Sequence, residues 1–418
     1  MANYTKTSIG KEKIRMKINK RLLPIFAIVL IFLAAFIAGS FSHRDQSDAR
    51  EVIRSELDRL KDLDSKTTQK YISYKEMFPD ATENTELSDE INNVFSLFFQ
   101  KFDYKILDIS VDKKSKTAEA SLKLTTIDAQ SLARDFATEL LKTQITETAQ
   151  AKSGTVKDSS KSLEGHYLIL NRLLTTNTYD STENNCTIEL INNGSGQKEN
   201  WEIRRTYSLE NDLVGGLMVY LSDPDILSPE DTLSVYFNTL KKMNLEEMSS
   251  YLGVLNIMNT SDSVKNSIAE ALVEQVHQNF NFKIQSSSVN GYNATVTTAI
   301  TTFDSNAILS NYQSSLDTYL ASPDAVIDGS QKRYEKSLDF LLNSIKNNTA
   351  TTTSDVDFVL INDGASWNLQ DEGNTLGDAI FGTLTSSPLD EDSDSSDSDS
   401  SEDSFETTDD TDTETYDS

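Results

Sequence analysis

The sequence predicts an α+β protein that consists of an N-terminal transmembrane helix, two tandem repeats and a disordered acidic tail. Three observations support this prediction: a signature that occurs twice, one long uncharged segment near the N-terminus, and a C-terminal segment almost without apolar residues. The 418 residues suit this organisation, because globular domains average roughly 150 residues.

The repeated signature has three parts, which follow one another in the same order in both halves of the chain. The paired motifs are Phe102-Asp103-Tyr104-Lys105-Ile106 with Phe280-Asn281-Phe282-Lys283-Ile284, Thr125-Thr126-Ile127-Asp128 with Thr301-Thr302-Phe303-Asp304, and Leu190-Ile191-Asn192-Asn193-Gly194 with Leu360-Ile361-Asn362-Asp363-Gly364. Each third motif is followed by one of the only two tryptophans, Trp201 and Trp367. Internal repetition of this kind predicts two copies of one module, at residues 45–222 and 226–386.

Apolar spacing predicts the same order of elements in each repeat: three helices, two strands, two helices and two strands. In the first repeat these are helices from about residue 45, over 67–78 and after the N-cap Ser88; strands 103–111 and 116–126; a helix capped by Asp128 and a helix over 161–174; strands 185–192 and 200–207; and a closing helix over 208–221. Strand 116–126 places Ala118, Ala120, Leu122 and Leu124 on one face, which is typical of a half-buried strand.

The second repeat follows a short linker, Ser222-Asp223-Pro224-Asp225. It opens with Ser228-Pro229, a serine cap followed by a proline at the first helical position. Asn290-Gly291 predicts a hairpin turn between its first two strands. The apolar positions then match those of the first repeat in order and face, and insertions are confined to loops.

The N-terminal segment predicts a single-pass membrane anchor. Residues 1–21 carry seven Lys or Arg against one Glu, and residues 22–39 contain no charge. Eighteen helical residues span about 27 Å, which suffices for a hydrocarbon core, and the basic flank is expected to stay in the cytoplasm. The alternative is a signal peptide that is cleaved near Ala38-Gly39-Ser40, which would make the protein secreted.

The charge distribution limits the partners. The net charge is −28, and residues 390–418 hold fourteen Asp or Glu and no base. Phosphate backbones are bound by clustered Lys and Arg, so no nucleic-acid partner is expected. Residues 388–418 have too few apolar side chains to offset the entropy of ordering, and we expect a disordered tail there.

The residues that could carry chemistry are few and scattered. Cys186 lies in a strand-like stretch and is expected to be an inert core residue, and the three histidines lack metal-ligand spacing. Asp128 and Asp304 end equivalent strands, where capping of the next helix is the simpler explanation. Trp201 and Trp367 are expected to fill cores, and Lys105 and Lys283 to face solvent. We therefore expect no catalytic residue, cofactor or metal site.

The order of elements resembles the nuclear transport factor 2-like superfamily, as do the Phe-x-Tyr/Phe-Lys-Ile strand, the Thr-Thr-x-Asp strand end and the Asn-Asn/Asp-Gly hairpin that precedes a tryptophan. This resemblance covers about residues 46–220 and 226–385. It implies two cone-like domains in which a curved antiparallel sheet wraps around helices. Pairs of such domains behind an anchor are similar to envelope proteins of Gram-positive bacteria. The helix after Asp128 and Asp304 departs from the simplest members.

The sequence thus favours a non-enzymatic, membrane-anchored binding or scaffolding protein on the outer side of the cell membrane. An envelope protein or a small apolar ligand is the expected partner. The alternative is a small-molecule enzyme of the ketosteroid-isomerase type within one cone, which the superfamily resemblance implies. Such an enzyme needs an Asp base and an oxyanion hole in an apolar pocket, and the sequence offers no residue-by-residue match.

Overall fold

The computed structural model describes residues 43–82, 89–151, 159–194, 200–254, 263–370 and 374–386. The predicted anchor at 22–39, the cap Ser88 and the acidic tail lie outside these residues. Among the described helices, none is both long and apolar enough to cross a membrane.

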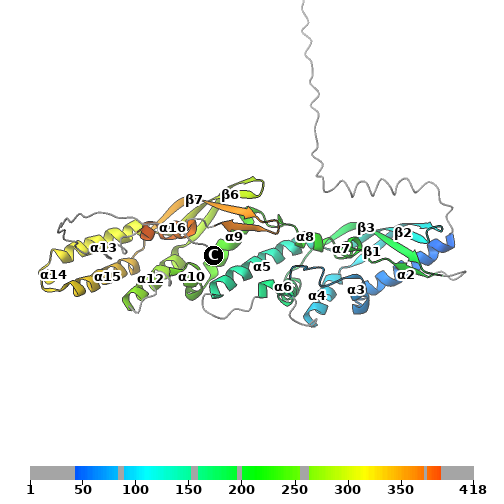
Figure 1. Ribbon diagram of the computed structural model, residues 1–418, viewed down its shortest axis with the longest axis horizontal. Helices are drawn as coiled ribbons and strands as arrows, with labels where there is room; N and C mark the ends of the chain where they lie inside the picture. The colour runs from blue at the N-terminus through cyan, green and yellow to red at the C-terminus, as the bar shows by residue number, and fades with distance from the viewer. Residues whose placement is uncertain are drawn as a thin grey trace, which may run out of the picture.

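The described chain is a mixed α+β structure with two four-stranded antiparallel sheets, which lie one after the other along the long axis (Figure 1). The elements of the first repeat are α2 (His43–Lys61), α3 (Ser65–Tyr71), α4 (Asp89–Phe99), β1 (Asp103–Asp112), β2 (Thr117–Ile127), α5 (Ala129–Ala151), η1 (Ser159–Lys161), α6 (Leu163–Thr176), β3 (Ser181–Asn192), β4 (Trp201–Ile203), α7 (Tyr207–Leu213) and α8 (Leu217–Leu221). Its strands pair in the order β1-β2-β3-β4.

The second repeat has the same order of strands, β5-β6-β7-β8. Its elements are α9 (Pro229–Lys242), α10 (Leu245–Tyr251), α12 (Ser263–Asn279), β5 (Asn281–Asn290), β6 (Asn293–Phe303), α13 (Ser305–Leu320), α14 (Pro323–Ile327), α15 (Ser330–Lys346), β7 (Thr351–Asn362), β8 (Trp367–Gln370), α16 (Thr375–Phe381) and η2 (Gly382–Ser386). Even the irregularities agree, because both first strands shift register directly after the signature isoleucine, Ile106 or Ile284.

The predicted core faces of the two middle strands are confirmed. Ala118, Ala120, Leu122 and Leu124 are all buried, as are their counterparts Ala294, Val296, Thr298 and Ile300. Burial of one strand face beneath helices is what the alternating pattern requires. The predicted turn is also confirmed: Asn290 pairs with Asn293, and Gly291 takes the positive φ of +65° that glycine adopts without strain.

Three predicted elements of the first repeat have the wrong bounds. The predicted helix 67–78 is α3, which ends at Tyr71, because the buried carboxylate of Glu210 accepts a hydrogen bond from the Ser73 backbone N–H. The predicted strand 200–207 ends at Ile203, because Thr206 caps α7 by accepting from the Leu209 N–H.

The predicted closing helix 208–221 is broken into α7 and α8 at two glycines with positive φ, Gly215 and Gly216. A side chain at Gly215 would place its Cβ 2.5 Å from Thr126 Oγ1, so the chain passes too close to β2 for any other residue.

Helix α5 is longer than the predicted stripe of Leu132, Phe136 and Leu140, and it joins the two repeats. Its first half packs in the first core through Leu132 and Phe136. Its second half buries Ile145 and Ala149 in the second core, against α9 and α10. Figure 1 shows α5 between the two sheets, directed toward α9 and α10. The second core is therefore completed by a helix of the first repeat.

The linker between the repeats is held by the second one. Asp225 Oδ1 accepts hydrogen bonds from Trp367 Nε1 at 2.9 Å and from Asn362 Nδ2 at 3.1 Å. Trp367 is only 5% exposed, so its indole N–H needs this partner inside the fold. Together with α5, the linker gives the repeats two separate attachments.

We predict that two truncations on α5 destabilise different repeats. Leu132→Ala and Ile145→Ala each remove a buried aliphatic side chain, at a cost of roughly 2–5 kcal/mol. Amide hydrogen exchange is expected to accelerate in β2 and α6 for Leu132→Ala, and in α9 and α12 for Ile145→Ala. Equal acceleration in both repeats for Ile145→Ala would contradict its place in the second core. That each repeat folds alone stays a prediction. Expressed by themselves, residues 226–386 would lack the part of their core that α5 provides.

Candidate functional site

A cavity of about 470 Å³ lies at the junction of the two repeats. Its walls come from α5 of the first repeat and from α9, α10, β8 and α16 of the second. The lining residues are Leu141, Gln144, Ile145, Thr148, Tyr236, Tyr251, Leu252, Leu369, Asn374, Leu376 and Gly377. Ligand cavities commonly measure about 300–1,000 Å³, so this space can hold a small molecule.

The contribution of α5 follows from helix geometry. Leu141, Gln144, Ile145 and Thr148 are spaced by three, one and three residues, which places them on one face of the helix. The C-terminal end of α5 is anchored to α10, where Ser250 Oγ donates to Ala149 O at 2.5 Å and Gln150 Nε2 donates to Glu247 Oε1 at 3.0 Å. These contacts hold the wall of the cavity against α10.

The described lining of the cavity combines aliphatic side chains with polar ones. None of the lining residues that the structure describes carries a charge. Three lining side chains, Gln144, Tyr236 and Asn374, form no hydrogen bond with another residue that the structure describes. Burial raises the pKa of Tyr236, so its hydroxyl stays neutral and can both donate and accept. A bound molecule would thus meet aliphatic walls and a few polar groups.

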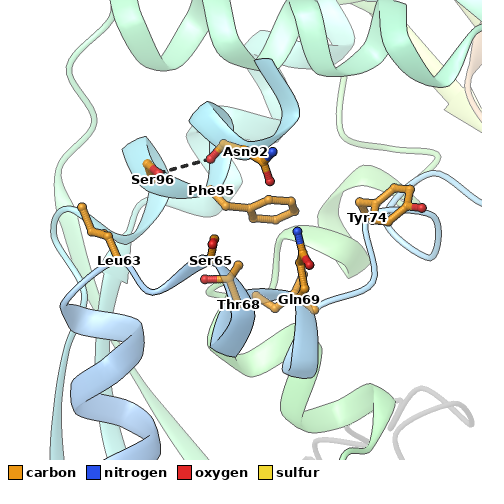
Figure 2. A pocket seen from close by; sticks show the side chains of 9 residues that line it. Leu63, Ser65, Thr68, Gln69, Tyr74, Asn92, Phe95 and Ser96 are labelled. Atoms are coloured by element: carbon orange, nitrogen blue, oxygen red, sulfur yellow. Dashed lines mark hydrogen bonds between the residues drawn. The ribbon is translucent and has the colours of Figure 1, made fainter. Parts of the chain in front are cut away.

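A second, much smaller hollow lies between α3 and α4. Its volume is about 20 Å³, which is little more than one water molecule needs. Figure 2 shows the Phe95 ring at its centre, with Asn92 on one side and Thr68 and Gln69 of α3 on the other. A hollow of this size does not hold a small-molecule ligand, and we do not assign a site there.

The residues of the repeated signature lie elsewhere and have structural contacts. Asp304 caps α13 by accepting from the Asn306 and Ala307 N–H groups, and Asp128 accepts from the Ser131 N–H at 3.1 Å. A carboxylate that accepts N–H bonds at an exposed helix start is a cap. It does not meet the requirement of the ketosteroid-isomerase alternative, which is a base inside an apolar pocket.

The aromatic members of the signature serve packing. Phe102, Phe280, Trp201 and Trp367 are buried, and each tryptophan pairs with the asparagine of its hairpin motif in the sheet. Tyr104 donates to Asp58 Oδ1 at 2.7 Å, and Phe282 packs with its ring centre 5.1 Å from that of Phe237. Lys105 and Lys283 are exposed. None of these residues lines the junction cavity.

Other titratable groups are also accounted for by packing. His166 Nε2 lies 2.8 Å from Ser160 O between the rings of Phe78 and Phe136, and burial lowers its pKa. Burial raises the pKa of the Cys186 thiol, which makes it a poor nucleophile. Within the described ranges, no three His, Cys, Asp or Glu side chains are grouped as metal ligands.

Sequence reasoning missed the residues of the junction cavity. The apolar spacing of α5 continues past Leu140 through Leu141, Ile145 and Ala149, and this was the available signal. It could have shown that the helix has a second buried stretch. It could not have shown that this stretch packs on α9 and α10, because spacing identifies a face and not its partner.

Comparisons with known proteins identify no family. No protein-family profile matches the chain, and no curated protein matches it. Among solved structures, a crystal structure of a candidate lipoprotein, YcdA of Bacillus subtilis, aligns with 66% of this chain and 95% of its own at 10% identity, with a TM-score of 0.25. That score is too low to support an inference about fold or function.

Capping predicts a specific response to substitution at Asp304. Asp304→Ala removes the acceptor at the start of α13 and is expected to lower the free energy of unfolding by about 1 kcal/mol. Asp304→Asn keeps an equally good cap and is expected to change it little. Urea unfolding of both variants measures the difference. Equal loss in both variants would argue against a capping role.

The half-buried carboxyl of Asp212 predicts a pH dependence of stability. Burial raises its pKa to about 6, although the Cys186 thiol donates a hydrogen bond that acts in the opposite direction. A carboxyl whose pKa is raised on folding binds its proton more tightly in the native state. Stability is therefore expected to fall as pH rises from about 4 to 6, and to remain lower above that range.

Asp212→Asn is expected to remove this fall, because the amide does not ionise. The side chain keeps some contact with water, so the gain at pH 7 is expected to be only about 1 kcal/mol, or a few degrees in Tm. Thermal unfolding of wild type and variant at pH 4 and pH 7 measures it. An equal Tm difference at both pH values would contradict the ionisation of Asp212 as the cause.

Proposed function

We propose that the protein is a membrane-anchored binding or scaffolding protein of the cell envelope, with both repeats on the outer side of the membrane and no catalytic activity. The observation that carries the proposal is the junction cavity, whose described lining is uncharged and comes from both repeats. Such a cavity suits retention of a ligand, and the lining residues that the structure describes include no His, Asp, Glu or Lys to act as a general base.

Several sequence features support the location and the absence of catalysis. The uncharged segment 22–39 behind a basic head favours an uncleaved anchor with an exported C-terminal part. The acidic remainder of the chain disfavours nucleic acid as a partner. The features that the two repeats share are strand faces, caps and turns, as in the nuclear transport factor 2-like superfamily that the sequence resembles.

We predict that an envelope component stabilises the full chain. A molecule that binds only the native state adds about 2.7 kcal/mol to the free energy of unfolding at a hundred times its Kd. Fractions of envelope extract, lipid and protein separately, are added to the full chain in lipid nanodiscs, and Tm is measured. At least one fraction is expected to raise Tm by several degrees. Protease added to intact cells is expected to digest the chain beyond residue 45 and spare residues 1–21.

Two results would overturn the proposal. One is the absence of any stabilising fraction, together with conversion of a fraction's component by wild type and not by Asp128→Asn or Asp304→Asn. The other is recovery of a chain that begins at Phe41 in the medium, which would support the secreted alternative.

A further inference from the structure

We infer that the junction cavity takes a small, uncharged, largely aliphatic molecule with one hydrogen-bonding group, such as a long-chain alcohol or amide. This inference rests on the proposed binding function and specifies its ligand. It follows from a comparison of the two repeats, which have diverged at this cavity although they agree elsewhere.

The closing helices α7 and α16 align through features outside the predicted signature. Leu209, Leu213 and Gly215 have the same spacing as Leu376, Ile380 and Gly382. The four apolar residues are buried, and both glycines have a positive φ, of +65° and +56°. This alignment places Glu210 of the first repeat opposite Gly377 of the second.

Glu210 fills the corresponding space in the first repeat. Its side chain is 1% exposed, and its carboxylate accepts hydrogen bonds from the Ser73 N–H and from Arg205 Nη2, the latter at 2.9 Å. In the second repeat the position of Ser73 corresponds to Gly253, and Gly377 lines the cavity. The second repeat therefore lacks the carboxylate, and the Gly253 N–H donates instead to Ser250 O at 3.2 Å.

Helices α9 and α10, which also line the cavity, likewise carry neutral residues where the first repeat has charged ones. Alignment of α2 with α9 places Glu56 opposite Tyr236, and alignment of α3 with α10 places Lys70 opposite Ser250. In the first repeat Lys70 Nζ and the Tyr71 hydroxyl both donate to Glu56 at 2.9 Å. In the second repeat Tyr236 lines the cavity, and Ser250 holds α5 through Ala149 O. The Glu56–Lys70 ion pair of the first repeat is thus replaced in the second by two neutral residues, Tyr236 and Ser250, next to α5.

These replacements define the chemistry of the ligand. Burial of a charge without a partner is costly, and the lining residues that the structure describes offer no opposite charge, so the inferred ligand is uncharged. Leu141, Ile145 and Leu376 favour aliphatic surface. The side chains of Gln144, Tyr236 and Asn374 can each bond one polar group, which fixes its orientation.

Photolabelling of the full chain in lipid nanodiscs tests this inference. The probes are a long-chain aliphatic alcohol with a diazirine group and the matching carboxylic acid, followed by peptide mapping. The alcohol is expected to label peptides that contain Leu141–Thr148 or Leu376 about tenfold more strongly than the acid does, because a buried unpaired carboxylate is disfavoured.

Two matched substitutions on α5 provide the control. Thr148→Trp fills the cavity and is expected to reduce labelling by the alcohol about tenfold, because a ligand must fit the free volume. Thr143→Trp lies on the opposite face of the helix and is expected to leave labelling unchanged. Both threonines bond only the carbonyl four residues earlier, at 2.8 Å, so their loss is comparable. Gln144→Trp serves as a second filling variant if Thr148→Trp does not fold.

Equal labelling of wild type and Thr148→Trp would overturn the cavity as the site. Equal labelling by the alcohol and the acid would overturn the uncharged class of ligand. In either case an envelope fraction can still raise Tm, so failure of this inference is distinguishable from failure of the proposed binding function.

Discussion

The structure depends on the burial of one helix in two hydrophobic cores. Helix α5 has 23 residues and is therefore about 35 Å long, more than one repeat of this size can cover. Leu132 and Ile145, on its two halves, are each almost fully buried, in the first and the second core respectively. The polar contact between Arg134 and Asp231 at 2.8 Å is about half exposed on both sides and adds little. Apolar burial holds the repeats together.

The counterpart helix of the second repeat, α13, has different surroundings at its far end. Helix α13 is shorter than α5, and α14 and α15 close its far end. There the Tyr319 hydroxyl donates to Asp328 Oδ2 at 2.8 Å, and Lys332 and Lys336 contact the same carboxylate at 2.8 and 3.0 Å. A buried carboxylate with several donors can specify one arrangement of helices. A polar cluster in the second repeat thus takes the place of the helix packing that follows α5 in the first.

Much of the fold could be predicted from sequence, because its determinants are local. The strand faces, the Asn290-Gly291 turn and the serine cap of α9 each follow from a few neighbouring residues, and Ser228 Oγ accepts from the Asp231 N–H as expected. The end of α3 could not be predicted, because the residue that ends it, Glu210, lies 137 positions away. The junction cavity was missed for the same reason. It depends on α5 and on Gly377, which no local pattern connects.

Divergence between the repeats accounts for the neutral groups that line the junction cavity. In the first repeat, loss of Glu210 alone would remove the acceptor of the Ser73 N–H and one partner of the half-exposed Arg205. In the second repeat Gly377 offers no acceptor, and the Gly253 N–H donates instead to Ser250 O at 3.2 Å. Space that would otherwise face solvent is then covered by Leu141 and Ile145 of α5. The shared framework of the repeats positions the elements around the cavity, the presence of Gly377 in place of a glutamate leaves space there, and α5 of the first repeat provides one wall.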